Sequence, residues 1–258
     1  MLDPDRWNPP VAIAHRGSRL LWPENTMVAF SAAVEVGARH IETDVRVSAD
    51  GVVYCIHDPS VDRTTNAAGL FSQHSSQEIA GLDAGFGHAT PEGFPFRSAG
   101  VRIPMFEELV TSFPDIHVVV DLKEDAVVAP MVDLVRRLGI GDRLIVGSFS
   151  DARLARFREL TDGEVPTSVG TTTARSWLLA SRVGRGLSGP GSALQLPLQR
   201  GGVRVVDRKL VDAAHARGVQ VHVWTINDPD KMQELIEIGV DGIVTDRIDL
   251  LLEVLDGA

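Results

Sequence analysis

The chain has 258 residues, of which 44% are hydrophobic and 23% charged, with a formal net charge of −10 at pH 7. This length is close to the ~250 residues typical of one α/β barrel and is enough to bury a sizeable core. The acidic balance argues against nucleic acid as a partner, because backbone binding requires a basic face. It does not exclude a small anionic substrate, since a metal ion and a few basic side chains can reverse the local potential.

Targeting and redox features are sparse. No apolar run approaches the ~18–20 residues that a membrane span requires. The first ten residues lack the basic and apolar regions of a secretory signal. The single cysteine, Cys55, cannot form an internal disulfide and lies in an apolar run typical of a buried thiol. A reduced, cytoplasmic compartment is therefore expected.

Strand-like runs alternate with runs of helical spacing, which indicates βαβ units and a parallel sheet. Asn25 is the expected N-cap of the first helix and Gly37 its expected stop. In chain order the predicted strands are Val11–Ala14, Ile41–Val47, Val52–Ile56, Val118–Leu122, Leu144–Gly147, Thr167–Val169, Leu194–Leu196, Gln220–Thr225 and Gly242–Thr245. The predicted helices are Thr26–Val36, Val127–Leu138, Asp151–Leu160, Arg175–Val183, Lys209–Arg217 and Asp230–Ile238.

Nine predicted strands compete for the eight places of a barrel. We expect one of them, Leu194–Leu196 or Thr167–Val169, to be short or to lie outside the barrel. Asp50-Gly51 is a hairpin-type turn signal before Val52–Ile56. The segment Ser60–Val101 interrupts the alternation of strands and helices, and we interpret it as an excursion that caps the active site.

The second loop that interrupts the pattern is Gly184–Gly191, which we expect to be flexible. The sequence has no internal repeat and no stretch that reads as a linker between domains. We therefore expect residues 1–258 to form a single domain.

Two motifs in the first half of the chain place polar groups at strand ends, where α/β barrels build their active sites. His15, Arg16 and Gly17 follow the first strand, and a histidine with an adjacent arginine can move protons and bind phosphate. A histidine that merely caps the strand is an equally good interpretation of this motif alone. Glu42 and Asp44 are two residues apart on a strand, so they share a face and suit a hard cation such as Mg²⁺ or Ca²⁺. The alternative is an edge strand with two solvated acids.

Two further motifs complete the set. His57 closes the Val52–Ile56 run and gives a second histidine at a strand end, although a structural histidine would fit as well. Asp121 and Lys123 follow three valines and share a face, so that Asp121 could be a third carboxylate on the metal and Lys123 could bind phosphate. An ordinary surface pair is the alternative. Together, two histidines, three carboxylates and two cations are what phosphodiester hydrolysis requires.

The combined motifs resemble the glycerophosphodiester phosphodiesterase family, in order and spacing. The matching text is AHRG (14–17), PENT (23–26), AF (29–30), GARHIETDV (37–45), DG (50–51), HD (57–58), RTT (63–65), IPMFEEL (103–109), DLK (121–123), SF (148–149), VWTIND (223–228) and GVDGIVTD (239–246). The stretch Thr171–Arg200 matches poorly.

The resemblance implies an α/β fold, a (β/α)8 TIM barrel with a small insertion after the third strand. It implies that His15 and His57 are the acid/base pair and that Arg16 and Lys123 bind the phosphate of a glycerophosphodiester. It also implies that Glu42, Asp44 and Asp121 bind one divalent metal ion, Mg²⁺ or Ca²⁺. Glu24 and Asn25 would order the mouth of the first loop.

The implied reaction is metal-dependent and substrate-assisted: the glycerol hydroxyl beside the phosphate attacks phosphorus, and water then opens the cyclic phosphate. Trp224 would offer an apolar wall to glycerol carbons, with a core tryptophan as the alternative, and His222 is expected to pack within the barrel. One departure is that the family usually has Glu where this chain has Asp121, which leaves the identity of the metal open.

Two other functions remain open. A lysophospholipid-directed phosphodiesterase of the same superfamily would use an apolar channel near Ser60–Val101, where three phenylalanines lie in Gly85–Phe96. A non-catalytic barrel that binds phosphate or a metal is the third interpretation, although the presence of both histidines argues against it.

Overall fold

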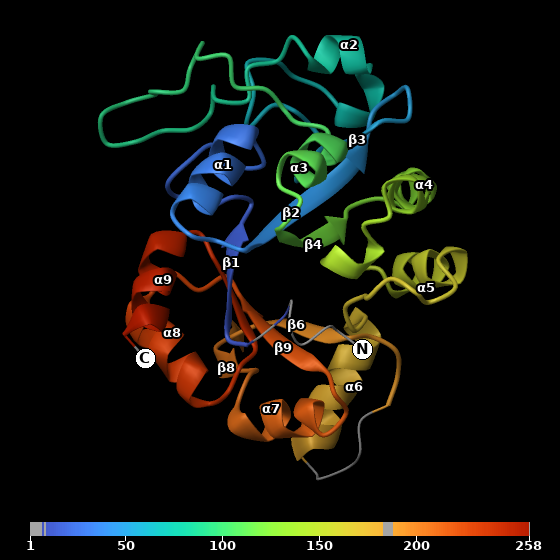
Figure 1. The fold of residues 1–258 in the computed structure, drawn as a ribbon, viewed down its shortest axis with the longest axis vertical. Coiled ribbons are helices and arrows are strands. Elements are labelled where there is room, and N and C mark those ends of the chain that lie inside the picture. The colour runs from blue at the N-terminus through green and yellow to red at the C-terminus, as the bar shows by residue number, and fades with distance from the viewer. Residues whose placement is uncertain (1–6, 8, 183–187, 258) are drawn as a thin grey trace.

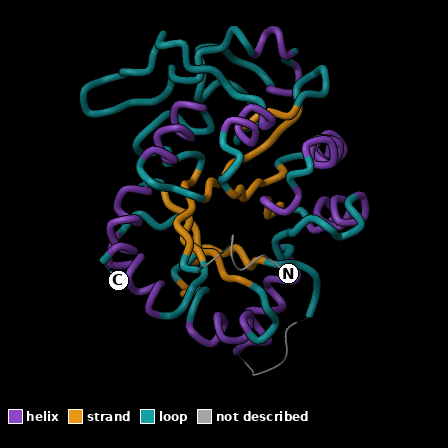
Figure 2. Tube along the Cα trace, in the orientation of Figure 1, coloured by secondary structure: helices purple, strands orange, loops and turns teal. Residues whose placement is uncertain are grey.

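The computed structural model describes residues 7, 9–182 and 188–257. Seven parallel strands form one sheet in the order β5-β4-β2-β1-β10-β9-β6, and the sheet curls into a barrel surrounded by helices (Figures 1 and 2). The strands are β1 (Val11–His15), β2 (His40–Val47), β4 (His117–Leu122), β5 (Leu144–Gly147), β6 (Ala193–Pro197), β9 (Gln220–Trp224) and β10 (Gly242–Thr245).

The eighth barrel position is filled by two single bridges. Thr167 pairs in parallel with Val146 of β5, and Ser168 pairs in parallel with Ala193 of β6. These bridges span the gap between β5 and β6, so the predicted (β/α)8 TIM barrel is confirmed.

The prediction that Leu194–Leu196 or Thr167–Val169 is short or lies outside the barrel holds in part, because Thr167–Val169 forms only two single bridges while neither segment lies outside. Leu194–Leu196 belongs to the barrel strand β6, and Thr167–Val169, although short, fills a barrel position. The extra strand is β3 (Val53–Cys55), which pairs antiparallel with the outer end of β2. The hairpin turn at Asp50-Gly51 reverses the chain, so β3 pairs antiparallel with β2 and takes no place among the parallel strands of the barrel.

The helices cover the outside of the barrel (Figure 2). Short 3₁₀ turns lie at Phe71–Gln73, Asp125–Val127 and Gly141–Arg143. The helices are α1 (Met27–Glu35), α3 (Phe106–Ser112), α4 (Val128–Leu138), α5 (Asp151–Leu160), α6 (Thr171–Arg182), α7 (Arg208–His215), α8 (Pro229–Glu237) and α9 (Ile248–Asp256), with α2 (Ser76–Ile79) in the insertion. The sequence interpretation missed α3 and α9, and it started α6 four residues late. A small antiparallel hairpin, β7 (Gln199–Arg200) and β8 (Val203–Arg204), follows β6. None of the helices within the described ranges is both long and apolar enough to cross a membrane.

The first helix begins one residue later than predicted. Its N-cap is Thr26, whose hydroxyl accepts a hydrogen bond from the Ala29 amide. Asn25 instead has a left-handed backbone, with φ of 54°, and turns its side chain toward Asp44. The predicted stop holds, since α1 ends at Glu35 and Gly37 has φ of 114°.

One end of the barrel interior is closed by aromatic rings. Trp7 is fully buried and lies against the rings of His40, His117 and His222, with centroid distances of 4.8, 5.5 and 6.1 Å. His40 and His117 begin their strands, so this cluster lies at the amino-terminal end of the barrel. His222 therefore packs inside the barrel, as expected, and the opposite end is left for polar side chains.

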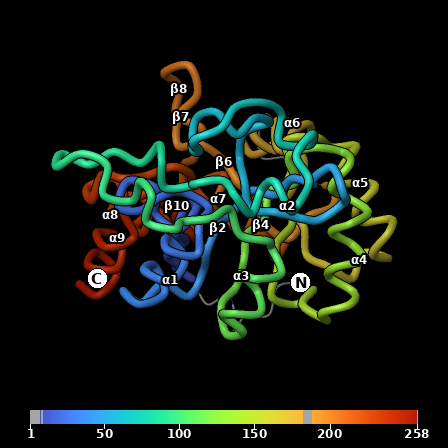
Figure 3. The backbone as a smooth tube through the Cα atoms, turned by 90° about the horizontal axis from the view of Figure 1, so that it is seen from above, coloured from blue at the N-terminus to red at the C-terminus, as the bar shows by residue number. Residues whose placement is uncertain are grey.

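The segment after β3 lies along one side of the barrel (Figure 1) and crosses in front of it when the molecule is seen from that side (Figure 3). It has a small apolar cluster of Tyr54, Ile56, Val61, Phe71, Ile79, Ala84, Val101 and Ile103. This cluster is separate from the main core and anchors the insertion predicted at Ser60–Val101. Residues 184–187 of the loop predicted at Gly184–Gly191 lie outside the described residues.

Candidate active site

The barrel register brings five of the predicted residues to the carboxyl ends of adjacent strands. His15, the last residue of β1, pairs with Glu42 of β2, and Asp44 of β2 pairs with Asp121 of β4. Lys123 follows β4 directly. Because parallel strands end at one edge of the barrel, residues far apart in sequence meet here.

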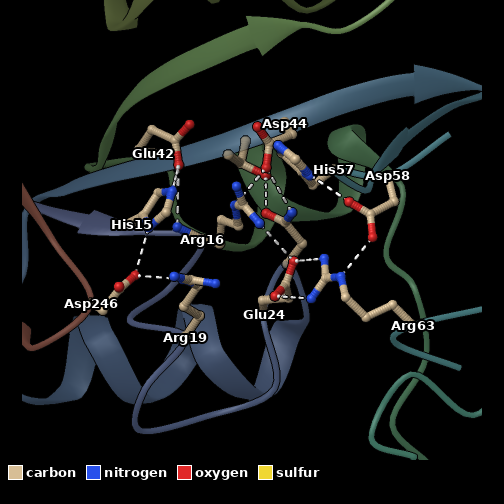
Figure 4. A network of polar contacts seen from close by, with 12 residues as sticks. His15, Arg16, Arg19, Glu24, Glu42, Asp44, His57, Asp58, Arg63 and Asp246 are labelled. Atoms are coloured by element: carbon tan, nitrogen blue, oxygen red, sulfur yellow. Dashed lines mark hydrogen bonds and ion pairs between the residues drawn. The ribbon is translucent and has the colours of Figure 1, made fainter. Parts of the chain in front are cut away.

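His15 is held by a carboxylate that the sequence interpretation did not assign. Its Nδ1 lies 2.6 Å from Oδ1 of Asp246, which follows β10. Arg19 and Asn227 donate to Asp246 at 3.0 and 3.1 Å and fix it in place. The other ring nitrogen, Nε2, lies 3.8 Å from Glu42 and faces the cluster (Figure 4). Two signals could have identified Asp246: its position directly after a predicted strand, and its place at the end of the matching text GVDGIVTD (239–246).

Arg16 lies on the floor of the site. Its Nη1 donates to Glu24 at 2.9 Å, and its Nε lies 3.0 Å from Asp44 Oδ2, an ion pair that is not aligned as a hydrogen bond. Asn25 also donates to Asp44 Oδ2, at 3.1 Å, and accepts a hydrogen bond from Thr43. Glu24 and Asn25, which were expected to order the mouth of the first loop, thus contact the Arg16 guanidinium and the Asp44 carboxylate.

Lys123 bridges two of the three predicted metal ligands. Its Nζ lies 2.7 Å from Asp44 Oδ1 and 2.6 Å from Asp121 Oδ2. Burial alone would lower the pKa of the ammonium, but the two carboxylates raise it above the usual value. The remaining oxygen of Asp121, Oδ1, is buried, and none of the described residues donates to it.

The carboxylates differ in their electrostatic surroundings. Burial and the charge of Asp44 raise the pKa of Glu42 to about 7. Burial also raises the pKa of Asp121. For Asp44, burial is outweighed by Lys123 and Arg16, which lower its pKa. Glu42 is thus a buried acid whose ionised form needs a further cation.

The donor set suits a hard divalent cation. Carboxylate oxygens are the ligands that Mg²⁺ and Ca²⁺ prefer, and Glu42 and the unpaired oxygen of Asp121 supply two. As the side chains stand, no group of three His, Cys, Asp or Glu residues in the described ranges is arranged to share an ion. Lys123 occupies the space between Asp44 and Asp121, so an ion held by all three predicted ligands requires its ammonium to move away.

His57 reaches the site from the antiparallel hairpin. The amide of Ile56 donates to the carbonyl of Asp44 at 2.9 Å, which sets the end of β3 level with the barrel mouth. Nδ1 of His57 lies 2.6 Å from Oδ1 of Asp58. Burial lowers the pKa of His57, against the opposing effect of Asp44 and Asp58. His57 was predicted to follow a strand end. It does so, but the strand is β3, which runs antiparallel to β2.

An aromatic pair stands beside Lys123. Trp224 ends β9, is half-buried, and meets the ring of Phe149 edge-on at a centroid distance of 6.0 Å. Phe149 is 67% exposed, and its ring centroid lies 5.8 Å from Lys123 Nζ. Trp224 and Phe149 therefore form an aromatic surface near the polar cluster.

Comparison with known proteins gives one consistent result. Residues 15–250 match the glycerophosphoryl diester phosphodiesterase family. The chain is 36% identical to a probable glycerophosphodiester phosphodiesterase 2 of Mycobacterium tuberculosis, over 95% of this chain and 90% of that protein. It is 30% identical to a glycerophosphodiester phosphodiesterase of Caldanaerobacter subterraneus subsp. tengcongensis, over 95% of this chain and 97% of that protein.

Solved structures agree in fold. A glycerophosphodiester phosphodiesterase from Agrobacterium tumefaciens superimposes with a TM-score of 0.76 at 29% identity, over 96% of this chain and 99% of that one. A phosphodiesterase from Oleispira antarctica, solved with the product sn-glycerol-3-phosphate, has a TM-score of 0.76 at 23% identity, over 96% and 97% of the two chains. At that identity the second likeness concerns the fold alone.

Proposed function

This chain belongs to the glycerophosphoryl diester phosphodiesterase family and is a phosphoric diester hydrolase, and we propose that it hydrolyses glycerophosphodiesters to sn-glycerol 3-phosphate and an alcohol. One observation carries the proposal. Two histidines, His15 and His57, each paired through Nδ1 with a carboxylate, flank a floor of buried charges (Figure 4).

The pairing of the histidines supports acid/base roles for both. Asp246 and Asp58 each occupy the Nδ1 side of one ring, so each imidazole keeps Nε2 for proton transfer. One histidine would take the proton of the attacking glycerol hydroxyl, and the other would protonate the leaving alkoxide. The same pair would then serve the attack of water that opens the cyclic phosphate.

The cationic side chains would bind the phosphate. Arg16 presents a planar guanidinium from the floor, and Lys123 presents a compact ammonium charge beside it. Trp224 would contact the glycerol carbons. Glu42, Asp44 and Asp121 would hold one divalent ion, which when bound neutralises charge on the phosphoryl oxygens. The shorter Asp121 leaves both Mg²⁺ and Ca²⁺ as candidates, and cytoplasmic location stays a prediction.

A lysophospholipid substrate is the second candidate. It is favoured by exposed aromatic side chains in the insertion, where Phe86 and Phe94 are 38% and 44% exposed. An acyl chain would need such an apolar surface next to the phosphate site.

The test is a panel of glycerophosphocholine, glycerophosphoethanolamine and lysophosphatidylcholine, assayed with chelator and then with each metal restored. We expect release of sn-glycerol 3-phosphate from the two water-soluble diesters only when Mg²⁺ or Ca²⁺ is present. Faster turnover of lysophosphatidylcholine would favour the second candidate. Tight binding of sn-glycerol 3-phosphate without turnover under any metal would favour a non-catalytic barrel.

A further inference from the structure

Arg63 connects the insertion to the two sides of the active site. Its Nε donates to Asp58 Oδ2 at 2.6 Å, while Nη1 and Nη2 donate to the two oxygens of Glu24 at 2.7 Å each (Figure 4). Such a fork holds planar groups in a fixed orientation, in a way that a lysine cannot. The guanidinium therefore ties two carboxylates that lie 34 residues apart in sequence, since 58 − 24 = 34.

Each of these carboxylates contacts one group of the proposed machinery. Asp58 uses its other oxygen to hold Nδ1 of His57 at 2.6 Å. Glu24 accepts from Nη1 of Arg16 at 2.9 Å. Arg63 is thus linked to the proposed acid/base group His57 through Asp58. It is linked to the proposed phosphate ligand Arg16 through Glu24.

The backbone of Arg63 is itself held in place by the insertion. A Cβ atom added at Gly87 would lie 2.3 Å from the carbonyl oxygen of Arg63, so this part of the chain packs directly against it. Gly87 lies in the same insertion, well after Arg63 in sequence. The position of the guanidinium accordingly depends on how the insertion folds.

Taking the proposed function as its basis, we propose that Arg63 is a positioning residue that orients His57 through Asp58 and Arg16 through Glu24, and that this is how the insertion serves the reaction. The hydrogen bonds to Asp58 and Glu24 supply the orientation. The charge of Arg63 also offsets that of Asp58: burial would raise the pKa of this carboxyl, but bonds from Arg63 and His57 hold it at about 2.

The test compares Arg63→Met and Arg63→Lys with Arg97→Met as the matched control. Arg97 is also an insertion arginine, but it stacks on Phe86 and Phe94 and donates to the Phe86 carbonyl. We expect R63M to lower kcat on glycerophosphocholine by roughly tenfold to a hundredfold. R63K keeps the charge but cannot reach both carboxylates, so it should recover only part of the loss, and R97M should behave like wild type.

A second measurement does not need turnover. The imidazole of His57 is followed by NMR in wild type and R63M, which reports its tautomer and its titration. Without Arg63 the charge of Asp58 is less compensated, so the pKa of His57 should rise and the population of the Nδ1–H tautomer should change. An unchanged tautomer and titration in R63M, or full recovery of kcat in R63K, would overturn the positioning role. If wild type fails to cleave glycerophosphodiesters, the proposed function fails, and the NMR result still decides the role of Arg63.

Discussion

His15 and Asp246 lie 231 positions apart in sequence, yet the imidazole Nδ1 and the carboxylate Oδ1 are 2.6 Å apart. The contact exists because β1 and β10 are neighbours in the barrel, paired from Val11 with Gly242 to Ala14 with Thr245. A pair of this kind fixes the tautomer and orientation of the histidine. It also ties the last barrel strand to the first at the proposed reaction centre.

Replacing Asp246 by Asn tests this contact. An asparagine side chain has one acceptor oxygen instead of two and carries no charge, so it cannot accept from His15 and from Asn227 on separate oxygens as Asp246 does, and His15 loses its fixed orientation. We expect kcat on glycerophosphocholine to fall by roughly tenfold to a hundredfold. The matched control is His215→Gln, which breaks a similar pair, His215 with Asp241 at 2.8 Å, outside the cluster of strand-end residues. Equal kcat in D246N and wild type would show that the pair is structural only.

Lys123 allows a prediction about metal affinity. Its ammonium lies between Asp44 and Asp121, where a divalent ion shared by the two carboxylates would have to compete with it. Lys123→Met removes the charge while keeping an aliphatic stem, so we expect the Kd for Mg²⁺ or Ca²⁺ in calorimetry to decrease by about tenfold, equivalent to roughly 1.4 kcal/mol. Turnover should fall in the same variant, because a phosphate ligand is lost.

The control for this variant is Lys231→Met. Lys231 forms a helix-surface pair with Glu234, so its removal should leave ion affinity and turnover unchanged. Weaker ion binding in K123M would contradict the competition between the ammonium and the metal.

The buried end of the barrel predicts a pH dependence of stability. Burial, and then the neighbouring His40, lower the pKa of His222 from the usual value of about 6.5 to about 3. Between these two values the unfolded chain binds a proton that the folded chain does not, so the free energy of unfolding falls as the pH decreases from about 6.5. The slope from this residue is at most about 1.4 kcal/mol per pH unit.

Denaturant unfolding of His222→Gln at pH 7, 6 and 5 measures that slope. We expect the free energy of unfolding of wild type to fall more steeply than that of H222Q as the pH decreases. His74→Gln, on the half-exposed surface of the insertion, serves as the control and should keep the wild-type slope. If the free energy of unfolding fell equally with pH in wild type and H222Q, His222 would not be the source of the pH dependence.

Much of the barrel could be predicted from the sequence because strand alternation and helix stops are local. Ile41–Val47 and Asp151–Leu160 were recognised within a residue or two, and Gly139 ends α4 with a left-handed backbone, as a C-cap glycine should. The failure to identify Val52–Ile56 as the extra strand has a simple cause. Period-two spacing identifies a strand but does not give its direction. Only the hairpin signal at Asp50-Gly51 indicates that the chain reverses before Val53–Cys55, so that this strand is antiparallel to β2.

The site was predictable in its members but not in its partners. Alternation alone placed Glu42 with Asp44, and Asp121 with Lys123, on common faces. The contacts of Lys123 with Asp44 and of His15 with Asp246 depend on strand order in the closed barrel, which no local pattern encodes. Side chains that bridge separate elements, such as Arg63, are hidden for the same reason.

The central claim is that His15 and His57 act as an acid/base pair on a glycerophosphodiester. Its most direct test is kcat for release of sn-glycerol 3-phosphate from glycerophosphocholine by His15→Ala and His57→Ala, with the preferred metal present. We predict that each substitution lowers kcat by roughly 10²–10⁴-fold while the fold is retained. Turnover at the wild-type rate in either variant would contradict the assignment.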